Sequence, residues 1–470
     1  MQRGLASRVG SIVFSEFLTP DTREREIAGA MHIAVLGINY WPDRTGIAPF
    51  TTGRCEYLAA RGHRVTVFTG FPYYPGWRIP SAYRGRLLSR EVRNGVSIFR
   101  SWLYVPHLVT GTRRILHEAS FIASASIRTL ARVRREKPDL LFVVSPPLGL
   151  GLTAFTLSRL WKVPYVFHVA DLQPDAALEL GMLERSRTLS ALFAIERLAY
   201  RSAARVSTLT HAIRQRIVEK GVTPEKVVLF SDWADPALFN IPLDDCGDEF
   251  KRSFGLRGRF LVLHAGNVGV KQGLEVMLNA AELSRTRNDI AWLVAGDGAM
   301  RETLQERARS RGLGNLWFIP LQPDSIFREM LAAADVCLVT QRKTVGDVVF
   351  PSKVLTLLAA GRPVIASLNM SSAVARAIQE AEAGLLAKPE DPDALLTSVL
   401  ALQSNAEARA AMRSHGRSYA RRHWDRERIL PLFEAELVRV AEPRRTATAV
   451  RYSSRRTTAQ SAADEYRTEC

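Results

Sequence analysis

The sequence contains few cysteines and no long apolar run. Its four cysteines, Cys55, Cys246, Cys337 and Cys470, are scattered over 470 residues, and no two stand at the spacing of metal ligands. This pattern argues against a disulfide framework and a structural zinc site, and it is typical of a reduced, cytoplasmic protein. No uninterrupted apolar run approaches the ~20 residues of a membrane-spanning helix, so we expect no such helix.

Acidic residues are scarce relative to basic ones. The chain has 47 Asp and Glu against 64 Lys and Arg, which gives a formal net charge of +17. A surplus of this size favours nucleic acid, anionic lipid headgroups or phosphorylated substrates as partners, and it does not choose among them. The hydrophobic content of 47% is that of a folded globular protein. A chain of this length is expected to form two domains.

Short β-branched runs alternate with helical stretches from Met31 onward. The first series includes strands over His32–Ile38, Arg64–Gly70 and Leu140–Ser145, and a second series begins with the apolar run after Arg259. This alternation predicts an α/β protein with two parallel, doubly wound sheets. In such a protein we expect the ligand in the cleft between the domains, beyond the carboxyl ends of the strands.

Composition marks the ends and the middle of the chain. Residues 1–30 lack the apolar core of a signal peptide, and we expect a disordered extension there, with the structured protein and the translation start near Met31. A first domain over 31–235, a turn-rich linker over 236–258 and a second domain over 259–440 follow. The tail over 441–470 is basic and poor in apolar residues, so we expect it to be disordered.

The segment from Arg259 to Glu282 joins an apolar strand to a helix through a loop that holds Gly266, Gly269 and Gly273. Strand, glycine-rich loop and helix form the arrangement that points backbone N–H groups and a helix N-terminus at a phosphate. Lys271 adds a full positive charge to this loop. An ordinary turn of a parallel sheet, which also favours glycine, is the alternative.

Several longer motifs carry a resemblance to a known family: NYWPDRTGIAPF near the start, then HAGNVGVKQGLE, VAGDGAMRETL, ADVCLVTQ and VVFPSKVLTLLAAGRPVIAS (Val348–Ser367). With them the chain resembles, from about Met31 to Val440, the retaining glycosyltransferases of family 4. That family has the GT-B fold, in which two Rossmann-like domains face a cleft. The Val348–Ser367 motif and DLQPDAALELG (Asp171–Gly181) are similar to the exopolysaccharide, colanic-acid and fucosamine transferase subgroup.

The resemblance implies a hexosyltransferase of exopolysaccharide, capsule or O-antigen biosynthesis. It would move a sugar, with retained configuration, from a nucleoside-diphosphate-sugar bound by the second domain. The acceptor, a polyprenyl-diphosphate-linked sugar or an oligosaccharide, would bind the first domain, and the last helix would cross back to that domain. The resemblance implies no cofactor, no metal and no nucleic acid partner, and a cytoplasmic enzyme that contacts the inner face of the cell membrane.

On the donor side, the family's glycine loop holds the diphosphate with an Arg and a Lys. Here Asn267 occupies the Arg position and Gln272 the Lys position, with Lys271 one place earlier. Lys353 in FPSK would supply the missing charge, and a solvated lysine at a helix start is the alternative.

The family's two glutamates, eight positions apart, fall on Val348 and Thr356, of which only Thr356 can hydrogen-bond a sugar hydroxyl. The glycines of AGDG either line the donor cleft or form a simple turn. The resemblance thus assigns the donor to Gly266, Asn267, Gly269, Gly273, Gly296, Gly298, Pro351, Ser352 and Thr356.

On the acceptor side, PDRTGIAPF keeps only Gly46 of the family's glycine pair, and we expect Gly46 and Asp43 there. Where the family has His-Asp after a strand, this chain has Ala170 and Asp171. Asp171 either fixes a sugar hydroxyl or orients the acceptor, and capping of the next helix is the alternative. His168, on the strand itself, is interpreted as a core histidine.

Catalysis in this fold needs no general base with a tuned pKa, because the leaving diphosphate can itself accept the acceptor's proton. The protein then has to stabilise developing negative charge on the phosphates. We therefore expect Lys271, Lys353 and Asp171 to be the catalytic residues, and no metal site.

The stretch Thr112–Lys137 has helical periodicity and carries seven Lys and Arg against two Glu. A basic amphipathic helix can lie on an anionic membrane, and an ordinary packed helix with a solvated basic face is the alternative. Two other functions compete with transfer: a nucleotide-sugar epimerase of the same fold, for which we find no paired acid and base, and a basic nucleic-acid-binding protein without a recognised motif.

Overall fold

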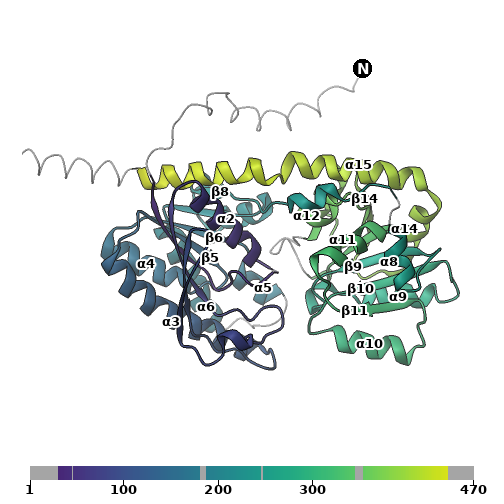
Figure 1. The fold of residues 1–470 in the computed structure, drawn as a ribbon, viewed down its shortest axis with the longest axis horizontal. Helices are drawn as coiled ribbons and strands as arrows, with labels where there is room; N and C mark the ends of the chain where they lie inside the picture. The colour runs from purple at the N-terminus through teal and green to yellow at the C-terminus, as the bar shows by residue number, and fades with distance from the viewer. Residues whose placement is uncertain (1–29, 45, 180–186, 245–246, 345–352, 443–470) are drawn as a thin grey trace, which may run out of the picture.

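The computed structural model describes residues 30–44, 46–179, 187–244, 247–344 and 353–442. The expected disordered ends, and the site positions Val348, Pro351 and Ser352, lie outside these residues. Figure 1 shows two α/β lobes side by side, each built around its own sheet.

The first lobe contains an eight-stranded sheet in the order β3-β4-β2-β1-β5-β6-β7-β8. Neighbouring strands are parallel except β3 and β4, which are antiparallel. All six residues of β5 are buried, because helices cover both faces of the sheet. The strands are β1 (His32–Leu36), β2 (Arg64–Gly70), β3 (Leu88–Arg93), β4 (Val96–Ser101), β5 (Leu140–Ser145), β6 (Tyr165–Val169), β7 (Arg205–Thr208) and β8 (Val227–Leu229). The helices are α2 (Ala48–Ala60), α3 (Gly111–Arg135), α4 (Leu150–Trp161), α5 (Gln173–Glu179), α6 (Arg187–Ser202) and α7 (His211–Glu219).

The second lobe contains a six-stranded, fully parallel sheet in the order β11-β10-β9-β12-β13-β14. Its strands are β9 (Phe260–Ala265), β10 (Ile290–Ala295), β11 (Leu316–Ile319), β12 (Val336–Thr340), β13 (Val364–Ser367) and β14 (Gly384–Ala387). Its helices are α8 (Asp248–Ser253), α9 (Glu275–Leu283), α10 (Arg301–Ser310), α11 (Asp324–Ala333), α12 (Lys353–Ala359), α13 (Ala373–Glu380), α14 (Pro392–Ser404) and α15 (Ala406–His423). The two doubly wound sheets confirm the predicted fold class.

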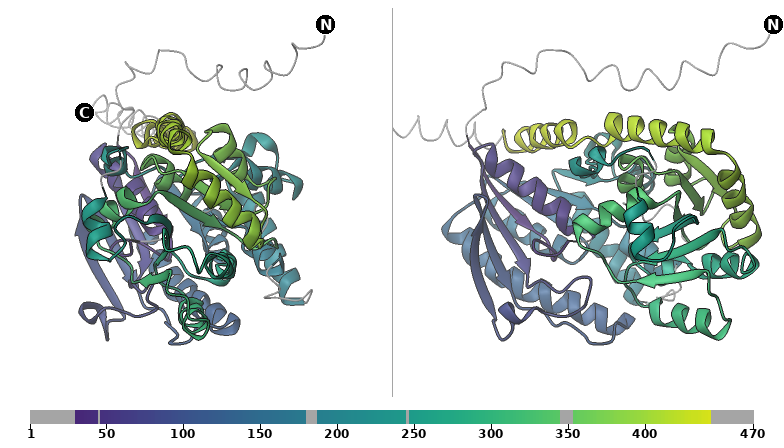
Figure 2. Two further views of the ribbon diagram at one scale, coloured as in Figure 1. Left: turned by 90° about the vertical axis from the view of Figure 1, so that its right-hand side faces the viewer. Right: turned by 45° about the vertical axis from the view of Figure 1, so that its right-hand side comes forward.

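The end of the described chain runs along both lobes. In Figures 1 and 2, α15 and the helix over residues 426–442 follow one side of the molecule. The second of these helices packs on the first lobe: Glu434 accepts a hydrogen bond from the Tyr57 hydroxyl at 2.8 Å, and Phe433 meets the Phe142 ring edge-on at 5.1 Å. The final helix therefore joins the second lobe to the first.

Helix α3 is the predicted basic helix, and it packs along one face. Its buried residues repeat every four positions: His117, Phe121, Ala125, Thr129 and Val133. On the flanking side, the Arg128 guanidinium lies 5.1 Å from the Phe99 ring. The packed-helix interpretation is therefore right for this face. The opposite face, which includes Ala119, Ala123 and Ile127, is exposed. None of the helices in the described residues is long and apolar enough to cross a membrane.

Candidate active site

The loop after β9 packs directly against the loop after β10. The Gly266 N–H donates to the Ala295 carbonyl at 2.9 Å, and the Val268 N–H donates to the Asp297 carbonyl at 2.8 Å. A Cβ on Gly296 would lie 1.8 Å from the Gly266 carbonyl oxygen, and one on Gly298 would lie 2.5 Å from the Val268 carbonyl oxygen. These glycines therefore allow two backbones to touch, which is a packing reason for them.

The same contacts determine which backbone donors are left for a ligand. The Gly269 N–H donates to the Gln272 side chain at 3.1 Å. Within the described part of the chain, the N–H groups of Asn267, Val270 and Lys271 have no acceptor. Since Val270 and Lys271 begin a short 3₁₀ turn (Val270–Gln272), these donors form the start of a helix, where an anion is favoured.

Lys353, the first residue of α12, reaches into this loop. Its Nζ lies 3.5 Å from Nε2 of His264 and 3.9 Å from the position that a Cβ on Gly266 would take. Burial lowers the pKa of Lys353 to about 8. Burial, with the Lys353 charge, holds the pKa of His264 well below its usual value, so this imidazole is neutral. Lys353 is therefore not a solvated surface lysine. It is a half-buried cation beside the loop after β9.

Lys271 and Asp171 interact electrostatically from the two lobes. Both side chains are half-buried, Lys271 in the loop after β9 and Asp171 in the loop after β6. Burial raises the pKa of the Asp171 carboxyl, and the positive charges of Lys271 and Arg114 oppose that rise. Burial lowers the pKa of Lys271, and the Asp171 charge opposes that fall. The pair therefore forms a charged centre to which both lobes contribute.

Asp171 does not cap the following helix. Helix α5 begins at Gln173, and no backbone N–H of the described residues donates to the Asp171 carboxylate. The cap interpretation thus has no support in the structure. His168 is buried and shares a hydrogen bond of 3.0 Å with the Ser207 hydroxyl, which confirms it as a core histidine.

Asp43 and Gly46 lie on the first-lobe side of this centre. Asp43 is buried and accepts a hydrogen bond from the Asn39 amide at 3.2 Å. Burial raises the pKa of the Asp43 carboxyl to about 6, against the opposing effect of that hydrogen bond. Gly46 adopts a positive φ of 66°, and a Cβ there would lie 3.5 Å from the Tyr74 ring. Asp43 is thus partnered inside the lobe, whereas Gly46 is exposed.

Two arginines near this centre were not assigned to the site from the sequence. Arg114 of α3 acts electrostatically on both Asp171 and Lys271. Arg342, just beyond β12, donates its backbone N–H to the Lys271 carbonyl at 3.0 Å and pairs with Glu275 at 2.9 Å. The position of Arg342, two residues after a buried strand, could have indicated a site residue in the sequence. For Arg114 the sequence showed only that it belongs to a basic helix.

The remaining features of the second lobe frame the donor side. Thr356 is half-buried on α12, one turn after Lys353. A pocket of about 410 Å³ opens at the loop after β10, lined by residues 297–299, Arg301, Glu302 and Gln305. Across the described residues, no three His, Cys, Asp or Glu side chains are grouped as a metal site would require.

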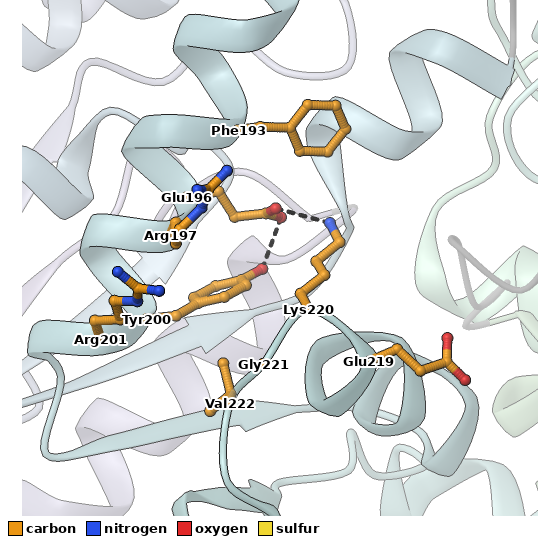
Figure 3. A pocket seen from close by; sticks show the side chains of 9 residues that line it. All are labelled: Phe193, Glu196, Arg197, Tyr200, Arg201, Glu219, Lys220, Gly221 and Val222. Atoms are coloured by element: carbon orange, nitrogen blue, oxygen red, sulfur yellow. Dashed lines mark hydrogen bonds and ion pairs between the residues drawn. The ribbon is translucent and has the colours of Figure 1, made fainter.

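A second pocket, of about 300 Å³, lies in the first lobe between α6 and the end of α7. Figure 3 shows Lys220 and Tyr200 pointing at the carboxylate of Glu196, at 2.7 and 2.9 Å. Lys220 also pairs with Asp175. Burial raises the pKa of Glu196, and the Lys220 charge opposes it. These groups satisfy one another, so the cluster stabilises the fold.

Replacing Lys220 by methionine should lower the free energy of unfolding by about 3 kcal/mol, because it leaves the Glu196 carboxylate buried without its cation. Chemical denaturation measures this loss. Lys388→Met is the matched control: Lys388 is 78% exposed and lies 3.9 Å from Asp391, so its removal should cost under about 0.5 kcal/mol. Equal losses in the two variants would contradict a structural role for the cluster.

Two family models match the chain, one on each lobe. "Glycosyl transferase 4-like domain" matches residues 45–233, and "Glycosyl transferases group 1" matches residues 259–405. The glycosyl transferase WcaI of Escherichia coli (strain K12), whose name places it in colanic acid biosynthesis, is 32% identical over 409 residues, which cover 86% of this chain and 98% of WcaI. The chain belongs to glycosyltransferase family 4. It is therefore an enzyme that transfers a glycosyl group.

Solved structures of low sequence identity share the fold of this glycosyltransferase. Sucrose-phosphate synthase from Thermosynechococcus elongatus superposes with a TM-score of 0.67 at 17% identity, over 87% of this chain and 98% of the synthase. HepE of Anabaena in complex with UDP-glucose superposes with a TM-score of 0.65 at 14% identity, over 87% of this chain and 99% of HepE. Both likenesses concern the fold, which is GT-B.

Proposed function

We propose that this enzyme is a retaining glycosyltransferase that moves a sugar from a nucleoside-diphosphate-sugar to a saccharide or polyprenyl-diphosphate-linked acceptor. One observation carries the proposal. The N–H groups of Asn267, Val270 and Lys271 have no acceptor among the described residues, and they belong to a loop that carries the half-buried Lys271 and that the half-buried Lys353 approaches at Gly266. This arrangement suits a diphosphate, because backbone donors and cations then meet the same anion in a partly desolvated place.

The proposed chemistry follows from that charge distribution. The bond between the anomeric carbon and the diphosphate oxygen breaks, and the acceptor oxygen bonds to the same face of that carbon. The acceptor's proton passes to the departing diphosphate oxygen, so no protein base is required. Lys271, Lys353 and the loop amides stabilise the negative charge that develops on the diphosphate, more strongly in the transition state than in the ground state. Metal independence is part of this proposal.

Asp171 would act on the opposite side of the transferred sugar. It lies on the first lobe and interacts electrostatically with Lys271, and it has no hydrogen-bond donor among the described residues. A half-buried carboxylate without a donor is well suited to accept a hydrogen bond from a sugar hydroxyl. Asp171 would therefore hold the donor sugar or orient the acceptor.

The pathway is proposed from relatives. WcaI is named for colanic acid biosynthesis, and a probable glycosyltransferase of Pseudomonas aeruginosa, WbjE, is 27% identical over 324 residues. From the name of WcaI we infer that this enzyme takes part in the synthesis of a polysaccharide, and we propose that it acts at the inner face of the cell membrane. The net charge of +17 and the exposed arginines at the two ends of α3 (Arg113, Arg114, Arg134 and Arg135) favour a peripheral contact with anionic lipid.

The nucleotide of the sugar donor can be identified because it should stabilise the folded protein. At a hundredfold excess over Kd, one of UDP, GDP and ADP should raise the free energy of unfolding by about 2.7 kcal/mol, since a ligand that binds only the folded state stabilises it by mass action. Thermal unfolding measures the shift. Sugar transfer from a panel of UDP- and GDP-sugars, followed by mass spectrometry, then identifies the donor. Folded protein that neither transfers nor hydrolyses any of them would exclude the proposed activity.

A further inference from the structure

His264 is a fully buried histidine near the carboxyl end of β9. At this residue β9 still pairs with β10, whereas its pairing with β12 ends at Leu263. The sheet order runs outward from β9 and β12 in opposite directions, so His264 lies where the two central strands separate. Ligands of open α/β sheets bind at such a point, beyond the carboxyl ends of the strands.

One nitrogen of His264 has no partner. Its Nδ1 atom is buried, and no hydrogen bond reaches it in the part of the chain that the structure describes. A buried polar group without a partner destabilises the fold. The preceding residues of β9 are all apolar, so packing alone gives no reason for a histidine at this position.

The other nitrogen, Nε2, lies near two groups of the donor side. It is 3.5 Å from Nζ of Lys353 and 3.4 Å from the carbonyl oxygen of Asn267, both at the long end of the hydrogen-bond range. Because a nitrogen of a neutral imidazole either carries a proton or accepts a hydrogen bond, Nε2 can serve only one of these partners at a time. With the proton on Nδ1, it accepts from the Lys353 ammonium. With the proton on Nε2, it donates to Asn267 and no longer accepts from the ammonium.

Lys353 depends on this acceptor more than the other cations of the donor side do. Lys271 interacts electrostatically with Asp171. Arg342 pairs with Glu275 at 2.9 Å. Lys353 has no carboxylate partner among the described residues, and burial lowers its pKa to about 8 without an opposing charge there. A hydrogen bond to the charged form of a group favours that form, so the imidazole lone pair helps to keep Lys353 protonated.

We propose that His264 is a positioning residue: its Nε2 accepts a hydrogen bond from the Lys353 ammonium and holds that charge beside Gly266, where the donor diphosphate binds. The inference rests on the proposed function, which places the diphosphate at this loop. It assigns the proton of the neutral imidazole to Nδ1. His264 acts on transfer through Lys353 and touches no substrate itself. A diphosphate that enters the loop then meets a cation that is already charged and in place, so less binding energy is lost in ordering it.

The pH dependence of nucleotide affinity tests this inference. UDP, GDP and ADP are titrated by calorimetry, and in the wild type the affinity should fall as the pH rises through about 8. His264→Leu should move this fall to lower pH by about one unit, because the lost hydrogen bond favoured the charged lysine. His264→Gln, whose amide can reach the place of Nε2, should keep the wild-type midpoint. His264→Asn, whose amide reaches only the place of Nδ1, should shift as His264→Leu does.

His168→Leu is the matched control, because His168 is a buried histidine on β6 whose Nδ1 shares a hydrogen bond of 3.0 Å with the Ser207 hydroxyl. It should lower the free energy of unfolding and leave the midpoint of the affinity change where it is in the wild type. In protein that already carries Lys353→Ala, His264→Leu should change the affinity less than about twofold, since its effect passes through the lysine.

An unmoved midpoint in His264→Leu and His264→Asn would overturn the inference, and so would an equal shift in His264→Gln or His168→Leu. Nucleotide binding by the wild type would still uphold the proposed function in each of these cases. If none of the three nucleotides binds the wild type, the proposed function itself fails.

Discussion

Replacing Lys353 by alanine should lower kcat/KM for sugar transfer by about 10²- to 10³-fold, the usual loss when one donor to a developing oxyanion is removed. The ammonium lies half-buried beside the glycine loop, 3.5 Å from a neutral histidine. Its charge is therefore screened less by water than that of a surface lysine. Steady-state kinetics with the donor identified by mass spectrometry measures the effect.

Asn267→Ala is the matched comparison for that variant. Asn267 is exposed, and its amide carries no charge, so its loss should cost less than about tenfold. Unfolding without ligand should be nearly unchanged in both variants. A larger loss of kcat/KM in Asn267→Ala than in Lys353→Ala would contradict the assignment of Lys353 as the residue that neutralises the diphosphate.

The pKa of Lys353 adds a readout that a purely structural role would not change. Burial lowers this pKa to about 8, so the unliganded enzyme carries the charge below pH 8 and loses it above. Nucleotide affinity should therefore fall as the pH rises through about 8. In Lys353→Ala this part of the pH dependence should be absent.

The parallel parts of the fold could be predicted from the sequence because their strands are buried on both faces. The predicted strands Arg64–Gly70 and Leu140–Ser145 coincide with β2 and β5. The antiparallel strand β3 was not predicted: its residues, LSREVR, are half exposed at the sheet edge and carry charges. Strand β14, with the sequence GLLA, was not predicted either, because it contains no β-branched residue and is mostly half exposed.

The candidate site was predictable one loop at a time, since each motif follows a strand. The electrostatic interaction of Lys271 with Asp171 could not be predicted, because it depends on how two lobes with separate sheets are placed relative to each other. The effect of Arg114 on the same two residues could not be predicted either, because the sequence shows only that it belongs to a basic helix. The spacing of the glycines in AGDG could not show their role either. In the structure, Gly296 and Gly298 allow the loop after β10 to contact the loop after β9. The positions Pro351 and Ser352 stay predictions, because they lie outside the described residues.

Asp171→Asn should lower kcat by about 10²-fold and leave the nucleotide-induced stabilisation unchanged. The amide keeps the shape of the side chain but removes the negative charge, which interacts with Lys271 and would accept a hydrogen bond from a sugar hydroxyl. Because the nucleotide is expected to contact the second lobe, a first-lobe variant should affect turnover and not nucleotide binding. Asp393→Asn is the control. Asp393 is exposed in the first turn of α14, away from the candidate site, so its loss should change kcat less than about threefold.

The pH profile separates this electrostatic role from a structural one. Burial raises the pKa of Asp171, and Lys271 and Arg114 oppose that rise without cancelling it. The functional form is the carboxylate, so activity should fall as the pH drops through a value above that of an ordinary aspartate. The asparagine variant should lose this acidic limb along with most of its activity, because the amide does not titrate. Wild-type turnover in Asp171→Asn, or an unchanged acidic limb, would mean that Asp171 takes no part in transfer.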